Sequence, residues 1–363
     1  MSTANPCPAL LLEVTRGPIV ESRHYGHVAV VDSSGRLLYQ AGDPHLVTYL
    51  RSSAKPIQAI PIIESGAAER FGLDDKDLAL ICASHSAAEE HTSRILSMLE
   101  KIGAEESDLK CGPHLPFDPE TAARMQREGQ APTARHSNCS GKHTGMLALA
   151  RQMRVLVEGY LEPTHTVQQR VIEAVSDVCG VAAEDIAIGV DGCGVPVFGM
   201  PLERMAYGFA RLADPSGLVR ARGKAAARLR DAMRANPYLV AGKGRLDYDL
   251  MQAAGDRLIS KGGAEGVHCI GVLPGKATRV PEPYRSQGIG IAVKADDGAN
   301  RGSVATALEV LRQLGVLEES QLAVLATYRV GPVKNLAGRA VGEMRPAFAL
   351  EPAAAKEHPH VPQ

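Results

Sequence analysis

The sequence predicts an α/β (α+β) domain in which a mixed, mainly antiparallel sheet is covered by helices. Strand-like segments lie near both ends of the chain, and helical segments lie between them. Regular alternation of one strand with one helix is missing, which argues against a doubly wound parallel sheet. With 363 residues and 45% hydrophobic content, the chain can bury a large core. We expect one two-lobed domain over residues 1–350 and a flexible tail over 351–363.

The N-terminal segment is predicted to be a strand meander. Residues 9–41 contain β-rich runs that are separated by the turn sequence Asp-Ser-Ser-Gly. After Pro44 the apolar residues take helical spacing. A helix is therefore expected to begin near Ser52 or Ser53 and to kink or end at Pro61.

The next stretch is expected to hold a strand, a helix and a long loop. The apolar run DLALICAS at 77–84 is typical of a buried strand, which would place Ser84 at a strand end. A helix should follow and end at Gly103. The polar, proline-rich residues 111–138 are expected to form a loop before a further helix begins near Ser140.

The rest of the chain alternates helical and strand signals. VQQRVIEAVSDVCG is expected to be helical, DIAIGVDGCGVPVFG to be a strand that runs into a glycine-rich turn, and 201–235 to be mostly helical. LISKGGAEGVHCIGVLPG and SQGIGIAVKADDG are expected to be neighbouring strands. The helix NRGSVATALEVLRQLG should follow them.

Composition argues against several classes of partner. Forty basic and 41 acidic residues give a formal net charge of −1, which provides no electrostatic footprint for nucleic acid. No lysine-rich run suggests a membrane surface, and no apolar run approaches the length of a membrane span. The first twenty residues lack a basic leader, so we expect no secretion signal. Seven scattered cysteines are typical of a reducing cytoplasm: Cys7, Cys82, Cys111, Cys139, Cys179, Cys193 and Cys269.

The first candidate for chemistry is Ser52-x-x-Lys55. This spacing puts both side chains on one face of a helical turn, where a neutral lysine could take the serine proton. The pattern is frequent by chance, because Ser107-x-x-Lys110 also matches it. The alternative interpretation is a helix cap followed by an exposed lysine. Arg51, just before the serine, is suited to holding a carboxylate.

Two later motifs add to this candidate by their order. Ser-His-Ser at 84–86 is a second hydroxyl cluster, and Lys261 is followed by two glycines. The order is similar to that of serine β-lactamases and penicillin-binding proteins. The late motif lacks their Lys-[Thr/Ser]-Gly hydroxyl, and 84–86 is not Ser-Asp-Asn. A shared scaffold is therefore expected, with penicillin chemistry as an alternative.

A metal site is one interpretation of two further motifs. Cys139, Lys142 and Cys193 lie in CSGKH and DGCG segments, each at a junction or tight turn. Cysteines without a Cys-x-x-Cys partner are usually small buried hydrophobic residues, and lysine binds a metal only after losing its proton. A bound divalent cation would itself enforce that loss. No nucleotide-binding glycine motif or His-Glu-x-x-His occurs, so no organic cofactor is expected.

Five ordered segments together resemble a known family. RSSAK, ASHS, HSNCSGKHTGM, GVDGCGVP and SKGGAEG are similar to motifs of the rhizobial-type (class 3, Ser-Lys dependent) L-asparaginases of the asparaginase II family, over about residues 9–345. The resemblance implies a serine β-lactamase-like fold and a homodimer. It also implies hydrolysis of L-asparagine to L-aspartate and ammonia.

The resemblance also implies roles for particular residues. It pairs Ser52 with Lys55 and Ser84 with Lys261 as catalytic residues, and it makes Cys139, Lys142 and Cys193 ligands of Zn²⁺. Substrate-binding or supporting roles fall on Arg51, Ser53, His143 and Asp191.

From these roles we expect Ser52 to attack the amide carbonyl after Lys55 takes its proton. Ser84 and Lys261 would relay the proton to the leaving ammonia. Which serine attacks stays open, because two hydroxyl–amine pairs in one site can exchange roles. Two alternatives remain: a penicillin-recognising serine hydrolase, and a metal-binding sensor without turnover.

Overall fold

A nine-stranded antiparallel sheet is the largest element of the computed structural model, which describes residues 7–353. Its main path runs β10-β11-β1-β2-β9-β8-β7, and β3 pairs with both β2 and β12. The predicted meander and the late neighbouring strands are confirmed, and so is the α+β class. The strands are β1 Ala9–Arg16, β2 Ile19–Asp32, β3 Leu37–Ala41, β7 Leu258–Gly262, β8 Val267–Val272, β9 Ile289–Ala295, β10 Pro332–Lys334, β11 Ala340–Pro346 and β12 Glu351–Pro352.

A second, three-stranded sheet has the order β4-β6-β5. Its strands are β4 Val47–Tyr49, β5 Ala187–Val190 and β6 Pro196–Pro201. The strand and glycine-rich turn predicted for DIAIGVDGCGVPVFG are confirmed, and the turn leads straight into a partner strand. Because β4 ends just before Arg51 and β5 just before Asp191, this small sheet delivers both side chains to one place.

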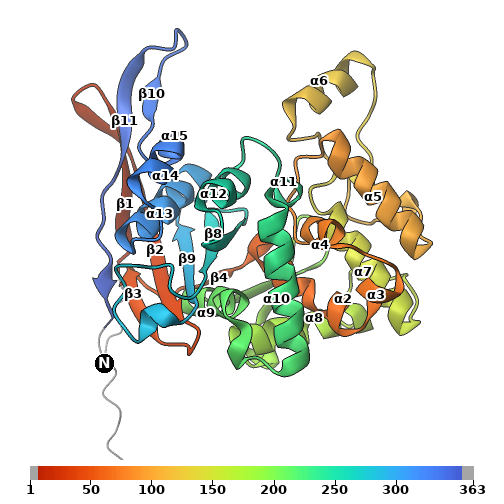
Figure 1. The fold of residues 1–363 in the computed structure, drawn as a ribbon. Helices are drawn as coiled ribbons and strands as arrows, with labels where there is room; N and C mark the ends of the chain where they lie inside the picture. The colour runs from red at the N-terminus through yellow and green to blue at the C-terminus, as the bar shows by residue number, and fades with distance from the viewer. Residues whose placement is uncertain (1–6, 354–363) are drawn as a thin grey trace, which may run out of the picture.

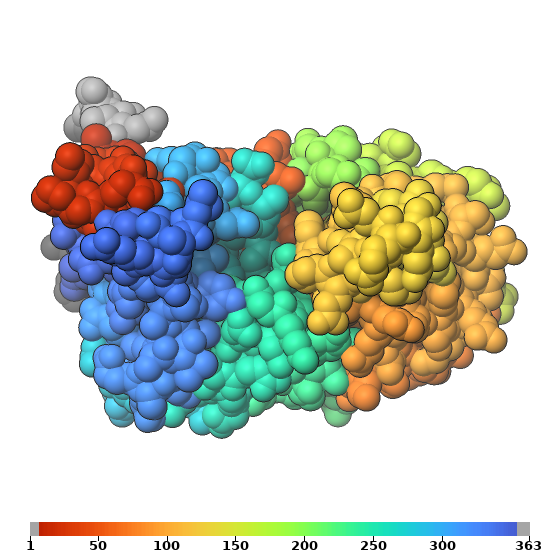
Figure 2. Space-filling model, turned by 90° about the horizontal axis from the view of Figure 1, so that it is seen from above, coloured from red at the N-terminus to blue at the C-terminus, as the bar shows by residue number. Residues whose placement is uncertain are grey.

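Most helices gather beside the main sheet rather than over it. Figure 1 shows α2 to α8 and α10 on one side of the molecule, and the sheet with α12 to α15 on the other. The helices are α1 Lys55–Gln58, α2 Ile60–Glu64, α3 Ala67–Arg70, α4 Asp75–Ile81, α5 Glu89–Ile102, α6 Pro119–Arg127, α7 Ser140–Met153, α8 Thr166–Cys179, α9 Leu202–Ala213, α10 Arg220–Ala235, α11 Pro237–Val240, α12 Leu246–Ala254, α13 Asn300–Gln313, α14 Glu319–Val324 and α15 Ala326–Arg329. Seen from above, a recess lies between the two parts (Figure 2).

Helices cover the main sheet on both faces. A Cβ atom on Gly290 of β9 would lie 1.7 Å from the Ala206 carbonyl oxygen of α9, so only glycine allows this close approach. Ala295 of the same strand lies against Gly302 of α13. Side chains an odd number of residues apart point to opposite faces of a strand. The helices α9 and α13 therefore enclose the sheet between them.

The segment at 77–84 is not the predicted strand. Residues 75–81 form α4, which begins with a reciprocal capping box between Asp74 and Asp77. Residues 77–81 are all buried, so the run carries no amphipathic period. A short apolar run of this kind fits a buried helix as well as a buried strand. Ser84 consequently lies in the segment after a helix.

Two further expectations need correction. The loop predicted for 111–138 contains helix α6, whose start is marked by Asp118 as the cap and Pro119 in the first turn. The tail expected from residue 351 does not begin there, because Glu351 and Pro352 pair with β3. Residues 354–363 of that expected tail lie outside the described residues.

The helices that carry the candidate motifs begin close to where they were predicted. Arg51–Ala54 form a 3₁₀ turn that leads into α1. The helix is interrupted before α2, which has Pro61 in its first turn. Helix α7 begins at Ser140 as predicted. A Cβ on Gly141 would lie 2.1 Å from the Leu80 carbonyl oxygen. Glycine at this position thus lets α7 pack directly on α4, next to Ser84.

Candidate active site

The amine of Lys55 lies at the centre of the candidate site. The side chain is 1% exposed, and Nζ lies 2.7 Å from the Ala83 carbonyl oxygen, 3.0 Å from Ser84 Oγ and 3.2 Å from the Asn138 carbonyl oxygen. No carboxylate contacts it within the described chain. Burial lowers the pKa of this amine, against the opposite influence of Cys139. Burial thus favours the uncharged amine, the form that can accept a proton.

The hydroxyl that contacts Lys55 belongs to Ser84 and not to Ser52. Ser52 lies one turn before Lys55, whose backbone N–H donates to the Ser52 carbonyl oxygen. Ser52 is partly exposed, and within residues 7–353 its hydroxyl makes no hydrogen bond. Ser84 is 4% exposed. The lysine thus has an accessible serine on its own helical turn and a buried serine as its direct partner.

The second lysine, Lys261, lies in β7 and is fully buried. Its Nζ contacts the Gly262 carbonyl oxygen at 2.8 Å and Asp247 Oδ2 at 3.5 Å. No hydrogen bond to Ser84 is found in the described residues, so the expected pairing of these two is not direct. Burial lowers the pKa of Lys261 to about 8, although Asp247 acts to raise it.

Ser53 connects the two lysine-bearing segments. Its buried hydroxyl donates to the Lys261 carbonyl oxygen at 2.8 Å. This bond ties the turn before α1 to strand β7, so it fixes the relative position of Lys55 and Lys261. Ser53 was expected to bind substrate, but its hydroxyl is directed into the protein.

Arg51 and Asp191 form an ion pair at the end of the small sheet. Arg51 Nε lies 3.0 Å from Asp191 Oδ1, which also accepts the Gly192 N–H at 2.9 Å. Arg51 has a left-handed backbone with φ 50°, which is unusual for a residue other than glycine and typical of functional sites. Burial would raise the pKa of Asp191, but Lys142, the Gly192 N–H and Arg51 lower it. Only Nε of the guanidinium is bonded within the described chain, so its outer nitrogens are available to a ligand.

The three predicted metal ligands come together at the start of α7. Lys142 Nζ lies 3.1 Å from Cys193 Sγ, and all three side chains are buried. A hydrogen bond from Cys193 lowers the pKa of the Cys139 thiol well below its usual range. Lys55 and Lys142, where they are protonated, add to this against the effect of burial. No cluster of three His, Cys, Asp or Glu side chains suited to a metal occurs in residues 7–353. A metal here would depend on the lysine.

His143 is buried behind this cluster and does not contact the arginine–aspartate pair. Its Nδ1 lies 2.7 Å from the Tyr160 hydroxyl, and its Nε2 has no partner in the described chain. Burial lowers the pKa of His143 well below its usual range, so the ring is neutral. We find no contact that supports the expected substrate-binding role.

Two residues that hold the site together were not singled out from the sequence. Asp247 of α12 contacts Lys261, as described above. His85 accepts the Ala87 N–H at Nδ1 and contacts Ser140 Oγ from Nε2 at 2.9 Å, which joins the Ser84 segment to the start of α7. His85 lies between Ser84 and Ser86, so its position in that motif could have indicated a role in the site. Asp247 belongs to no motif.

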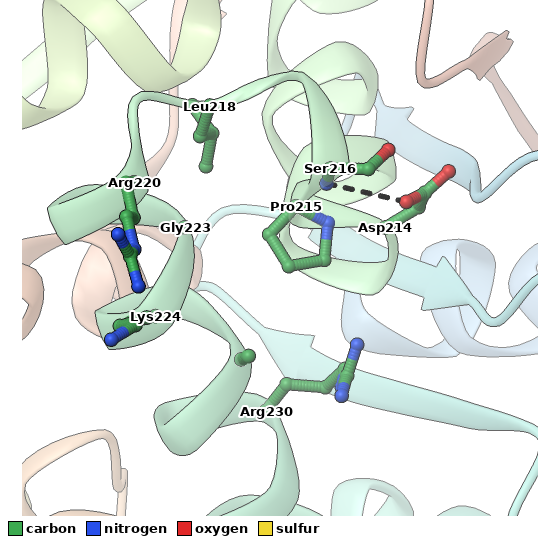
Figure 3. A pocket seen from close by; sticks show the side chains of 9 residues that line it. Asp214, Pro215, Ser216, Leu218, Arg220, Gly223, Lys224 and Arg230 are labelled. Carbon is green, nitrogen blue, oxygen red and sulfur yellow. Dashed lines mark hydrogen bonds between the residues drawn. The ribbon is translucent and has the colours of Figure 1, made fainter.

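Two well-defined surface cavities lie elsewhere. One of about 590 Å³ is lined at the start of α10 by residues such as Asp214, Arg220 and Arg230 (Figure 3). Another of about 620 Å³ lies between α12 and α14, beside Tyr328. Neither contains a predicted site residue, so we place the site by its chemistry.

A buried amine against a hydroxyl, next to an arginine–carboxylate pair, defines a site suited to acyl transfer on a small polar substrate. This chain belongs to the L-asparaginase II family, whose model matches residues 12–346. It is accordingly an amide hydrolase with a small-molecule amide substrate. The resemblance stated from the motifs is thereby confirmed.

Other comparisons add less. A comparison with curated proteins gives no match. Among solved structures, a probable glutaminase from Bacillus subtilis is 15% identical, with 80% of this chain and 89% of that chain covered and a TM-score of 0.37. The protein Mglu in its tris and glutamate form is 16% identical, with 87% and 64% covered and a TM-score of 0.42. This chain thus spans just under two thirds of Mglu. Scores this low establish neither a shared fold nor a shared substrate.

None of the described helices is long and apolar enough to cross a membrane.

Proposed function

We propose that this protein hydrolyses the side-chain amide of L-asparagine to L-aspartate and ammonia through a serine nucleophile. The observation that carries the proposal is the buried Lys55 amine, which lies 3.0 Å from Ser84 Oγ and one helical turn after Ser52. A buried lysine without a carboxylate partner gives up its proton near neutral pH more readily than an exposed one. It can therefore activate a neighbouring hydroxyl.

In the first step, Ser52 Oγ attacks the amide carbon as its proton passes to Lys55. Ser52 is the better nucleophile candidate because it is partly exposed, while Ser84 is buried against the amine. The C–N bond then breaks, the proton passes from Lys55 through Ser84 to the departing nitrogen, and ammonia leaves an ester on Ser52. Water next adds to the ester carbon and gives its proton to Lys55. The C–O bond to Ser52 breaks, the serine is reprotonated, and L-aspartate is released.

Recognition of the amino-acid end is assigned to Arg51 and Asp191. The outer guanidinium nitrogens can hold the α-carboxylate in a bidentate contact, and Asp191 Oδ2 can accept the α-ammonium group. Because Arg51 Nε and the Gly192 N–H fix Asp191 Oδ1, the second oxygen keeps a constant orientation. A zwitterion would thus meet a zwitterionic site.

Zinc is the metal that the donor set fits. Two thiols and one amine nitrogen converge. Zinc favours sulfur and nitrogen ligands, and three protein ligands would leave one of its four coordination positions open. The 3.1 Å separation of Lys142 Nζ and Cys193 Sγ is close to the roughly 3.5 Å expected between tetrahedral zinc ligands. We propose that Cys139, Lys142 and Cys193 hold Zn²⁺. The bound ion would orient the substrate near Asp191 without activating water.

The decisive experiment is a panel of amide substrates with ammonia detection. L-asparagine should be hydrolysed, L-glutamine more slowly because its amide is one methylene further from the amino-acid site, and nitrocefin not at all. In Ser52→Ala and Lys55→Ala, ammonia release should vanish while circular dichroism shows retained folding. Ser107→Ala, in the exposed chance match to the motif, is the control.

Other outcomes select the alternatives. Full activity in both variants would exclude attack by Ser52 with Lys55 as its base. Loss in Ser84→Ala alone would make Ser84 the nucleophile. Nitrocefin turnover would favour a penicillin-recognising enzyme, and zinc binding without turnover on any amide would favour a metal-binding sensor. Sedimentation of the same sample tests the proposed homodimer.

A further inference from the structure

Several buried polar groups have no part in the proposed mechanism. The densest set surrounds Lys261 and comprises Asp247, Ser260 and His268. These residues come from α12, β7 and β8, and each is at most 6% exposed. A buried carboxylate needs hydrogen bonds to offset the loss of water, so its presence in this position requires an explanation.

The carboxylate of Asp247 is held on several sides. Oδ1 accepts the Ser260 hydroxyl at 2.7 Å, and the Gly262 N–H lies 3.0 Å from both carboxylate oxygens. Because Ser260 donates its proton to Asp247, its oxygen accepts from His268 Nε2, which lies 2.8 Å away. His268 is therefore the Nε2–H tautomer. The network leaves Asp247 one orientation.

That orientation directs Asp247 Oδ2 to the Lys261 amine, 3.5 Å away. The Gly262 carbonyl takes a second amine proton at 2.8 Å, and Ser53 holds the Lys261 backbone. Lys261 is thus fixed at its backbone and at its amine. The Ser260 hydroxyl does not contact Lys261; its part in the Asp247–Lys261 salt bridge is to fix the orientation of the Asp247 carboxylate.

We propose that Asp247 is a positioning residue of the hydrolase, which fixes the Lys261 ammonium and sets the pH at which this lysine changes charge. The proposal rests on the proposed amide hydrolysis only for its kinetic consequence. Both Asp247 and Lys261 stay inside the protein, so neither needs to touch the substrate for this role.

The charge of Lys261 depends on every group that faces it. Burial lowers the pKa of Lys261, Asp247 raises it, and Lys55 and Arg245 lower it, so that the result is about 8. Asp247 itself is kept ionised, because Lys261, His268 and the hydrogen bonds outweigh the burial that would raise its pKa. The other titratable groups nearby are Cys82, His268 and Cys269.

The test compares Asp247→Asn with Asp249→Asn, the same change two residues along α12. Removing the Asp247 charge removes the strongest neighbouring influence that raises the pKa of Lys261, so its titration midpoint should fall by about one pH unit or more. The midpoint is read from the ¹⁵N signal of the Lys261 amine, assigned by its absence in Lys261→Met. The alkaline inflection of kcat should move to lower pH by the same amount, whichever charge state of Lys261 is active. Asp249→Asn should move neither.

An unchanged midpoint in folded Asp247→Asn would overturn the proposal. A shifted midpoint in a protein that hydrolyses no amide would instead retain the proposal and reject the function on which its kinetic part rests. If Asp247→Asn does not fold, Ser260→Ala keeps the charge and removes the orienting hydroxyl. It should lower kcat two- to tenfold with KM unchanged, and an unchanged kcat would count against a positioning role.

Discussion

Lys55 and Lys261 are two buried lysines with opposite kinds of neighbour. Lys55 is surrounded by two backbone carbonyls and a serine hydroxyl, and within the described chain no carboxylate pairs with it. Lys261 shares its pocket with Asp247, whose carboxylate is held by Ser260 and the Gly262 backbone. Burial acts to lower the pKa of both amines. The opposing influence comes from the Cys139 and Cys193 thiols at Lys55 and from the Asp247 carboxylate at Lys261.

The difference suggests a division of labour. A buried amine without a carboxylate partner favours the uncharged form, because burial disfavours the charge, and the uncharged form is the one that accepts a proton. An amine beside a fixed carboxylate keeps its charge over a wider pH range and can stabilise a developing negative charge. Identical side chains thus acquire different chemistry from their neighbours.

The largest expected effect is on catalysis at Lys55. Replacing the base in Lys55→Met should lower kcat on L-asparagine by about 10³-fold, since general-base catalysis contributes 10² to 10⁴. Lys110→Met is the matched control, because Lys110 follows Ser107 at the same spacing but is exposed and contacts only a backbone carbonyl. Steady-state ammonia release measures both. Equal losses in the two variants would contradict the assignment of Lys55 as the base.

The two lysines should also differ in stability. Lys261→Met strands the buried Asp247 carboxylate without its cation, which should lower the free energy of unfolding by about 3–5 kcal/mol. Lys55→Met leaves no carboxylate unpaired, and Lys142 still faces the Cys139 thiol, so its cost should be clearly smaller. Urea unfolding followed by circular dichroism compares them. Adding Asp247→Asn to Lys261→Met should recover part of the loss; no recovery would show that the two side chains are not coupled.

The sequence predicted the elements around this site better than the contacts within it. The meander at 9–41, the helix from Ser140 and the strand that holds Lys261 all have clear periodicity or turn residues. The strand predicted at 77–84 is wrong, since residues 75–81 form a helix. The prediction failed because a fully buried apolar run shows no helical period and because the Asp74 capping box was not recognised. Local pattern is reliable where one face is solvated.

The side-chain pairs needed the tertiary structure. Spacing alone put Ser52 with Lys55, yet the Lys55 amine contacts Ser84, which lies 29 residues further along the chain, after α4. Asp247 was missed since nothing near it in the sequence distinguishes it from any helical aspartate. Asp247 reaches Lys261 because β7 packs against α12 in the folded protein.

A smaller effect is expected at the proposed zinc ligands. They bear on the comparison of the two lysines because Cys139 and Lys142 are among the main influences on the pKa of Lys55, whereas those on the pKa of Lys261 are other residues. Cys193→Ala removes one of three ligands and should lower zinc affinity by at least about 10²-fold. Cys179→Ala, also buried but away from the cluster, should bind zinc normally. Metal analysis after dialysis against a weak chelator measures this. Equal zinc content in both variants would contradict the proposed zinc site.

The smallest effect is expected for Arg51→Lys. This variant tests whether Arg51 binds the α-carboxylate of the substrate or acts on the reacting amide near Lys55. A lysine can meet either Asp191 or a carboxylate, whereas the arginine fork can meet both at once. Loss of one charge-assisted hydrogen bond should raise KM for L-asparagine about tenfold. The kcat value should change less, because the base and hydroxyls stay in place. Arg23→Lys, at the exposed Arg23–Glu13 pair, controls for the exchange itself. A fall in kcat at constant KM would instead mean that Arg51 acts on the reacting amide, closer to Lys55 than the recognition role requires.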